Sequence, residues 1–167
     1  MLAQNIFAQV PTAPNPSKLL TFNLGGPRLG MTYIPGNTAL YQFLSERNIG
    51  RTMSQFGWHF EYQVAPDIEG PAFVIEIVPL VGGVEYSTVI PSVSLVMGIR
   101  LPDGFEFGMG PNAIISDRGL KNSLVVAIGK SFAYGGVNIP INLSLATNPD
   151  GIRVSFIFGY SINTNSK

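Results

Sequence analysis

The residues of this chain that could do chemistry are few, and two of them lie close together. His59 and Glu61 are two positions apart, so in an extended strand their side chains point to the same side. A histidine that takes a proton from a serine would make a nucleophilic hydrolase, and Glu61 with Glu76 would make an acid and base pair. Spacing supplies no serine for His59, and a polar histidine inside a protein commonly serves as a hydrogen-bonding filler. We therefore expect no catalytic residue and no enzyme, with a lipid hydrolase or acyltransferase kept as an alternative.

Cofactor chemistry finds little support in the composition. The chain has no Cys and 1 His, which argues against thiolate or His-based metal sites. The Gly-rich segments LGGPRLG and VPLVGGVEY do not lead from a strand into a helix with the Lys of a phosphate loop. Lys plus Arg (10) balance Asp plus Glu (10) without a basic block, so nucleic acid is not an expected partner. We expect no metal and no cofactor.

The elements that must position His59 and Glu61 are strands. In SQFGWHFEYQV, large apolar residues alternate with small or polar ones, which is the period of a β-strand. Comparable segments are PRLGMTYI, AFVIEIV, PSVSLVMGIRL, FEFGMG, SLVVAIGKSFAY, VNIPINLSL and GIRVSFIFGYSI. One short helix is expected at about 38–50, after an Asn-Thr cap. The sequence predicts an all-β protein, an up-and-down antiparallel β-barrel of about eight strands with this helix in the first long loop.

The connections between these strands alternate in length. Short breaks at 66–70, 102–104 and 135–136 alternate with longer ones at about 35–53, 81–90 and 112–121, and the short break at 148–151 is an exception. In an up-and-down barrel, alternate connections emerge at the same rim, so one rim is expected to carry short turns and the other long loops. We expect residues 1–19 to form an extended Pro-rich leader, 20–163 a single barrel domain, and 164–167 a tail.

The two faces of the strands differ in a way that indicates which one points outward. Charged residues make up 12% of the chain and hydrophobic ones 46%, with a mean hydropathy of +0.27. The face opposite the apolar stripe is mainly Gly, Ser, Asn, Ala and Thr, which suit the narrow interior of a small barrel better than a water-facing surface. The predicted outward apolar and aromatic face comprises Trp58, Phe60, Tyr62, Phe73, Ile75, Leu95, Met97, Phe105, Phe107, Ile141, Leu143, Phe156, Phe158 and Tyr160.

Charged residues in the strands share the opposite, inward face. They come in both signs, and paired charges with hydrogen bonds are tolerable in an interior where isolated charges are not. The predicted lumenal ion-pair network comprises Arg28, Glu61, Glu76, Arg100, Glu106 and Arg153. His59, Gln63, Asn142 and Ser155 are predicted as polar residues of the lumen.

The last strand carries the most specific motif. Phe158-Gly159-Tyr160-Ser161-Ile162 is similar to the C-terminal assembly signal of bacterial barrels, a Gly followed by alternating aromatic or apolar residues. With the strand pattern over about 20–163, the sequence resembles the small, eight-stranded outer-membrane β-barrel superfamily of Gram-negative bacteria, although typical members end on an aromatic residue and this chain continues to Lys167. The resemblance implies the outer membrane or cell surface of a Gram-negative-type bacterium, with an extracellular location as the alternative.

These observations lead to one functional hypothesis and two non-enzymatic alternatives. The hypothesis is an outer-membrane barrel with a lumen plugged by side chains and a structural or interaction role exercised through its long loops, its outer face meeting a lipid bilayer or copies of itself. The first alternative is a subunit of an extracellular self-assembled polymer with the apolar face buried between copies. The second is a soluble, lipocalin-like carrier whose aromatic stripe lines a cavity for an apolar ligand. No specific protein or ligand partner is indicated.

Overall fold

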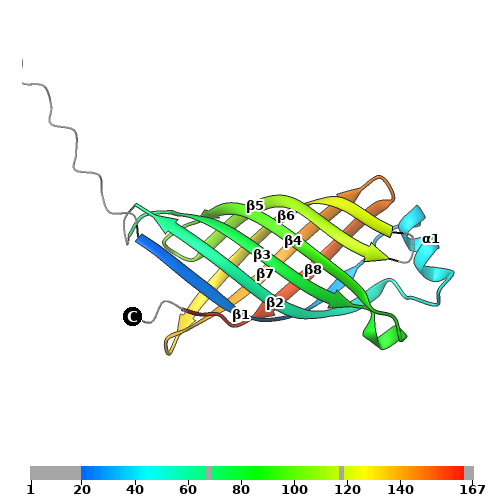
Figure 1. Cartoon of the computed structure of the whole chain (residues 1–167), viewed down its shortest axis with the longest axis horizontal. Helices are drawn as coiled ribbons and strands as arrows, with labels where there is room; N and C mark the ends of the chain where they lie inside the picture. The colour runs from blue at the N-terminus through cyan, green and yellow to red at the C-terminus, as the bar shows by residue number, and fades with distance from the viewer. Residues whose placement is uncertain (1–19, 67–68, 117–118, 164–167) are drawn as a thin grey trace, which may run out of the picture.

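The computed structural model describes residues 20–66, 69–116 and 119–163, and these form a closed up-and-down β-barrel (Figure 1). Each long strand pairs with the next in antiparallel fashion, and β8 returns to pair with β1. The predicted fold class is confirmed. The predicted leader, 1–19, and tail, 164–167, lie outside the described residues. The strands are β1 Leu20–Tyr33, β2 Thr52–Ala65, β3 Ala72–Gly82, β4 Ile90–Arg100, β5 Phe105–Ser116, β6 Gly119–Tyr134, β7 Val137–Asn148, β8 Gly151–Gly159 and a short β9 Ile162–Asn163.

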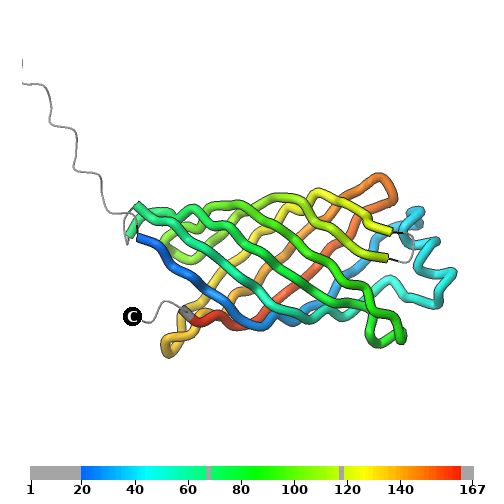
Figure 2. The backbone as a smooth tube through the Cα atoms, viewed as in Figure 1, coloured from blue at the N-terminus to red at the C-terminus, as the bar shows by residue number. Residues whose placement is uncertain are grey.

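The two rims of the barrel differ in their connections, as Figure 2 shows. The short-turn rim carries the start of β1, the end of β9 and the connections after β2, β4 and β6; the long-loop rim carries those after β1, β3, β5 and β7. One predicted long loop is wrong: β5 and β6 stay paired from Asn112↔Ser123 to Ser116↔Gly119. Polar residues such as Asn112 and Ser123 resemble loop residues in the sequence, but here they face the lumen. The long-loop rim therefore has two long connections, not three.

The first long connection contains the predicted helix, α1 Ala39–Ser45, which is shorter than the 38–50 expected. Thr38 caps it by accepting a hydrogen bond from the Tyr41 N–H at 3.3 Å. The helix stops because the chain turns back soon afterwards, with Asn48 at φ 58°. Ile34, Leu44, Ile49 and Met53 form a small buried core beneath it. No helix among the described residues is long and apolar enough to cross a membrane.

A second, unpredicted element occupies the connection after β3. The 3-10 helix η1 Val84–Tyr86 is tied to the barrel by the Tyr86 hydroxyl, which donates to the Thr52 carbonyl at 2.8 Å. The Glu85 carboxylate accepts from the backbone N–H of Ser54 at 2.5 Å and from its hydroxyl at 2.6 Å. Both long connections are therefore packed against the rim.

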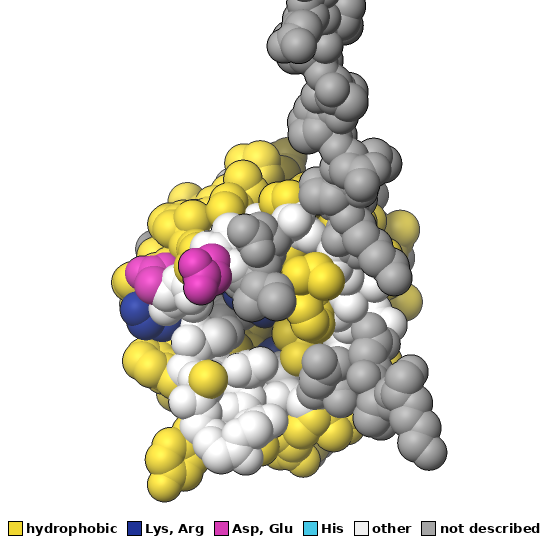
Figure 3. Space-filling view, turned by 90° about the vertical axis from the view of Figure 1, so that its left-hand side faces the viewer, with side chains coloured by type: hydrophobic (Ala, Val, Ile, Leu, Met, Phe, Trp, Pro, Cys, Tyr) yellow, Lys and Arg dark blue, Asp and Glu magenta, His cyan; other side chains and the backbone are white. Residues whose placement is uncertain are grey.

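Large apolar side chains point outward around the barrel. Trp58 is 45% exposed and Phe156 47%, and every residue of the predicted outward face is exposed except Ile75, which is half-buried. In the described strands, the outward positions carry one charged residue, Lys130, whose ammonium lies 4.1 Å from the centre of the Phe105 ring. Figure 3, which looks onto the short-turn rim, shows hydrophobic side chains around the circumference. A lipocalin-like carrier is ruled out by this geometry, because the aromatic stripe faces outward and not into the barrel.

Small residues on the inward face let neighbouring strands approach one another closely. A Cβ atom on Gly110 would lie 1.9 Å from the Leu95 carbonyl oxygen, and one on Gly57 would lie 2.1 Å from that of Pro79. No side chain fits at such distances, so the narrow, strongly bent wall depends on glycine at these positions.

The barrel closes where β8 and β9 meet β1. The pairing of β8 with β1 runs from Tyr33↔Val154 to Arg28↔Gly159, and β9 resumes it at Gly25↔Ile162. Pro27, in the gap, has no N–H to donate. The Arg28 guanidinium reaches across instead and donates from Nη1 to the Tyr160 carbonyl at 2.9 Å. A side chain thus replaces a backbone hydrogen bond at the closure.

Candidate functional site

Inside the barrel, five strands bring six titratable side chains together near the short-turn rim. This lumenal charge cluster comprises Arg28 from β1, His59 and Glu61 from β2, Glu76 from β3, Arg100 from β4 and Glu106 from β5. All are buried except Arg100, whose side chain is 13% exposed. They meet because inward positions of adjacent strands lie opposite one another: Glu61 pairs with Glu76, and Arg100 with Glu106.

Arg100 is the centre of the cluster. Its Nη1 lies 2.5 Å and its Nη2 2.9 Å from the two carboxylate oxygens of Glu61, a bidentate pair. Its Nε donates to Glu106 at 2.8 Å, and Nη2 donates to the same carboxylate. Gln63 also donates to Glu61. One guanidinium therefore hydrogen-bonds to two carboxylates with the planar, forked geometry that makes such pairs strong.

Arg28 fixes the state of His59. Its Nη2 lies 2.8 Å from His59 Nδ1, and because a guanidinium can only donate, Nδ1 must accept. The proton of the neutral ring is then on Nε2, which lies 3.3 Å from Glu76 and 3.6 Å from Glu61. Arg28 Nη2 also donates to the Ser161 hydroxyl at 2.8 Å. The ring thus lies between a cation and two carboxylates, although neither its Nε2 nor the Glu76 Oε1 has a hydrogen-bond partner among the described residues.

A metal ion does not suit this arrangement, although donor atoms of His59, Glu61 and Glu76 lie within 4.8 Å of one another. Binding through Nε2 would require that nitrogen to lose its proton while Nδ1 still accepts from Arg28. The Arg100 guanidinium already pairs with Glu61, and the Arg28 guanidinium already occupies the other nitrogen of the His59 ring. The geometry favours a hydrogen-bonded ion network over a metal centre.

A serine hydrolase arrangement is not assembled either. Among the described residues, no serine hydroxyl hydrogen-bonds to His59; the nearby Ser161 hydroxyl accepts from Arg28 instead. Both nitrogens of the His59 ring already face charged side chains. Chemically, the cluster can stabilise buried charges inside the barrel and join neighbouring strands through hydrogen bonds and ion pairs.

Arg153 lies apart from the cluster. Its Nη2 donates to Asn112 Oδ1 at 2.9 Å and to the Ser123 hydroxyl at 2.7 Å, and no carboxylate in the described part of the chain forms an ion pair with it. Of the predicted polar residues, Ser155 shares a hydrogen bond with Thr32 at 2.7 Å, and Asn142 is half-buried beside Gly129. The structure therefore brings five of the six predicted charges together and leaves Arg153 among neutral partners.

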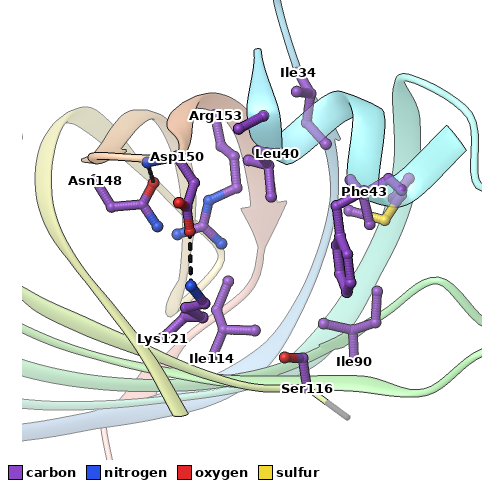
Figure 4. Close-up of a pocket in the computed structure, with 13 residues that line it drawn as sticks. Ile34, Leu40, Phe43, Ile90, Ile114, Ser116, Lys121, Asn148, Asp150 and Arg153 are labelled. Atoms are coloured by element: carbon purple, nitrogen blue, oxygen red, sulfur yellow. Dashed lines mark hydrogen bonds and ion pairs between the residues drawn. The ribbon is translucent and has the colours of Figure 1, made fainter. Parts of the chain in front are cut away.

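Sequence reasoning missed a cavity at the long-loop rim, which we call the mouth pocket. It has a volume of about 160 Å³ and lies between α1, the ends of β5 and β6, and the turn before β8. Figure 4 shows Lys121 and Asp150 joined by an ion pair at one side of it, 2.9 Å long. The sequence carries no signal for this site, because its inward charges come in both signs and the neutral partners of Arg153 are seen only in the structure.

Comparisons with known proteins bear on the fold. No protein-family model matches the sequence, and no curated protein does. Among solved structures, the chain is similar to Ail, the attachment invasion locus protein of Yersinia pestis, an eight-stranded outer-membrane barrel, with 13% identity over 85% of this chain and 97% of that one and a TM-score of 0.50. Ail in complex with the heparin analogue sucrose octasulfate gives a TM-score of 0.48 at 13% identity, over 85% and 97% of the two chains. A de novo designed transmembrane β-barrel gives 0.46 at 8%, over 84% and 95%.

The chain has the fold of a small outer-membrane β-barrel. At 13% identity, the likeness to Ail concerns the fold alone. This barrel fold and the apolar outer surface together support an outer-membrane or cell-surface location. In a barrel of this fold, the outer face and the side chains of the lumen are the parts that can carry a role.

Proposed function

We propose that this chain is a non-enzymatic barrel that spans the outer membrane, with a lumen closed by its own side chains and a structural or interaction role exercised at its long-loop rim. The observation that carries the proposal is the outer surface. Large apolar side chains cover it between the rims, and Lys130, its one charge in the described strands, lies at the short-turn rim beside Phe105 and Asp103. An apolar surface that continues around a whole molecule requires a covering, and hydrocarbon is the covering that suits it.

The inward face supports the second part of the proposal. The charge cluster stretches from β1 to β5 across the lumen, Val74 is buried beside it, and Val96 and Val125 are buried further along the lumen. On the short-turn side, an open recess of about 410 Å³ leads in as far as Gln63 and Arg100. Interdigitated side chains beyond this recess leave no continuous aqueous path in an eight-stranded barrel.

The long-loop rim supports the third part. Both long connections are ordered, one around α1 with its own buried core and one around η1, which Glu85 and Tyr86 bind to β2. Arg47 and Arg51 stack on Phe43 and Tyr41 with their guanidinium carbons 3.8 and 3.6 Å from the ring centres. Ordered loops on a rigid scaffold are where such proteins carry recognition.

The proposal is tested by expressing the chain behind a secretion signal and fractionating the cells. We expect the protein in the outer membrane, extractable only with detergent, and no stable single-channel current after insertion into a planar bilayer. A monodisperse monomer in detergent-free buffer would remove the membrane role. An ordered polymer formed without lipid would instead favour the self-assembling alternative, which uses the same apolar surface. Steady channel openings would overturn the closed lumen while leaving the membrane role intact.

A further inference from the structure

The mouth pocket joins an apolar wall to a polar one. Its apolar wall is formed by side chains from α1 and from the strands facing it, Ile34, Leu40, Phe43, Ile90 and Ile114, and Figure 4 shows these converging on the same space. The pocket opens at the rim, where the side chains of α1 and of the strands facing it leave a recess of about 160 Å³ between them. A concave apolar site with a few convergent polar groups is the general form of a small-molecule site.

The polar wall carries an unbalanced positive charge. Lys121 is paired with Asp150 at 2.9 Å, so those two charges cancel. Arg153 is 9% exposed, and its hydrogen-bond partners among the described residues are the neutral Asn112 and Ser123. No carboxylate of the described residues lies within ion-pair distance of it. A buried charge without a counter-charge is costly, and an anion bound in the pocket would remove that cost.

We infer that the mouth pocket binds a small amphiphilic monoanion, a medium-chain carboxylate whose head group pairs with Arg153 and whose chain lies against Ile34, Phe43 and Ile114. A carboxylate suits a guanidinium because two parallel N–H groups can donate to its two oxygens. A cavity of about 150 Å³ accommodates a guest the size of benzene, so the pocket's volume of about 160 Å³ suits one ring or an alkyl chain of about six carbon atoms, the short end of the medium-chain range. This site is independent of whether the lumen is closed.

Octanoate is the probe that tests the inference, with octan-1-ol as the uncharged chain and acetate as the anion without a chain. The full chain is refolded into nanodiscs, and empty nanodiscs correct for partition into lipid. We expect saturable binding of octanoate at one per barrel, at least tenfold weaker binding of octan-1-ol, and none of acetate. Equal affinities for octanoate and octan-1-ol would overturn the role of the charge, and binding that does not saturate would overturn the site.

Variants locate the binding. Arg153→Gln is expected to weaken octanoate binding at least tenfold, whereas Lys130→Gln, a cation at the opposite rim, should leave it unchanged. Should Arg153→Gln fail to fold, methyl NMR of the unaltered protein decides the matter. Octanoate should then shift the methyl signals of Ile34, Ile90 and Ile114 and leave that of Ile139 unmoved. The inference fails if Arg153→Gln folds and binds octanoate normally, or if the shifts occur away from the pocket.

Discussion

Glu61 and Glu76 lie directly opposite each other in the β2–β3 ladder, with both carboxylates turned into the barrel. Like charges in such a pair repel and destabilise a sheet. Arg100 grips Glu61 through two hydrogen bonds, and His59 Nε2 lies 3.3 Å from Glu76. The ladder therefore depends on side chains from other positions to make this pairing tolerable.

The first prediction concerns Arg100. Arg100→Met leaves Glu61 and Glu106 buried without their cation, and breaking a buried ion pair in this way costs about 3–5 kcal/mol. We expect a loss of this size in the free energy of unfolding, measured by urea denaturation in lipid vesicles. Lys130→Met, which removes a half-buried and weakly paired cation at the rim, should cost no more than about 1 kcal/mol. Equal losses for the two variants would show that the cluster has no special role in stability.

A second prediction separates lipid from water at the outer surface. Phe156 lies within β8 and pairs with Leu143 and Met31 on either side, whereas Phe105 begins β5 at the short-turn rim. An arginine facing lipid costs about 2–4 kcal/mol at the bilayer midplane and about 0–1 near its surface. Phe156→Arg should therefore destabilise the barrel in vesicles more than Phe105→Arg does. The reverse order of unfolding free energies would contradict a membrane-spanning belt.

The third prediction uses two adjacent glycines in β1. A Cβ atom on Gly26 would lie 1.8 Å from the Tyr160 carbonyl oxygen, while one on Gly25 would meet nothing closer than 3.4 Å. Gly26→Ala must push the closing strand away, and Gly25→Ala need not. We expect Gly26→Ala to lower the yield of folded barrel, read from heat-modifiable mobility in gels, and Gly25→Ala to fold like the original chain. A normal yield for Gly26→Ala would mean that closure tolerates a displaced backbone.

The fourth prediction concerns pH and the η1 connection. Slight burial acts to raise the pKa of Glu85, but hydrogen bonds from the Ser54 hydroxyl and backbone N–H outweigh it, and the pKa is lowered. A lowered folded-state pKa gives a contribution that is present above the ordinary glutamate value and is lost as pH falls through the folded value. Hydrogen exchange at Ser54 should therefore accelerate below about pH 4, near the ordinary glutamate pKa. In Glu85→Gln this pH dependence should vanish; its persistence would assign the effect to another group.

Alternation along the strands was enough to predict the barrel and the direction of its apolar face, because the period of two separates the faces without knowledge of neighbours. The sequence pattern could not predict the helix length, since the reversal of the chain at Asn48 depends on a positive φ that a non-glycine residue adopts only in context. The prediction of a loop at 112–121 was wrong because a polar residue such as Asn112 is typical of a loop, whereas here it bonds to Ser123 inside the lumen.

The register between neighbouring strands decides which inward charges meet, and the sequence does not state that register directly. In the β1–β8 ladder, Arg28 lies opposite Gly159. Arg153 lies nearer the start of β8, toward the long-loop rim, and so does not meet Arg28. There its neighbours are Asn112 and Ser123. Because the strands of a closed barrel are staggered, inward residues of different strands lie at different heights along the barrel axis, and here they form two separate groups.

Beside Pro27, the Arg28 side chain replaces a backbone hydrogen bond. This has a consequence for how the barrel closes during folding. Strands β1 to β8 can zip in order from hairpin to hairpin, but the first and last must find each other across the full length of the chain, so their union is the slowest entropic step. Because Arg28 donates to the Tyr160 carbonyl beside the gap in the β1 pairing, its side chain helps to hold the two edge strands in register. The pairing of β1 with β8 and β9 is interrupted at this point, so we expect the folded barrel to open there first when its strands are pulled apart sideways.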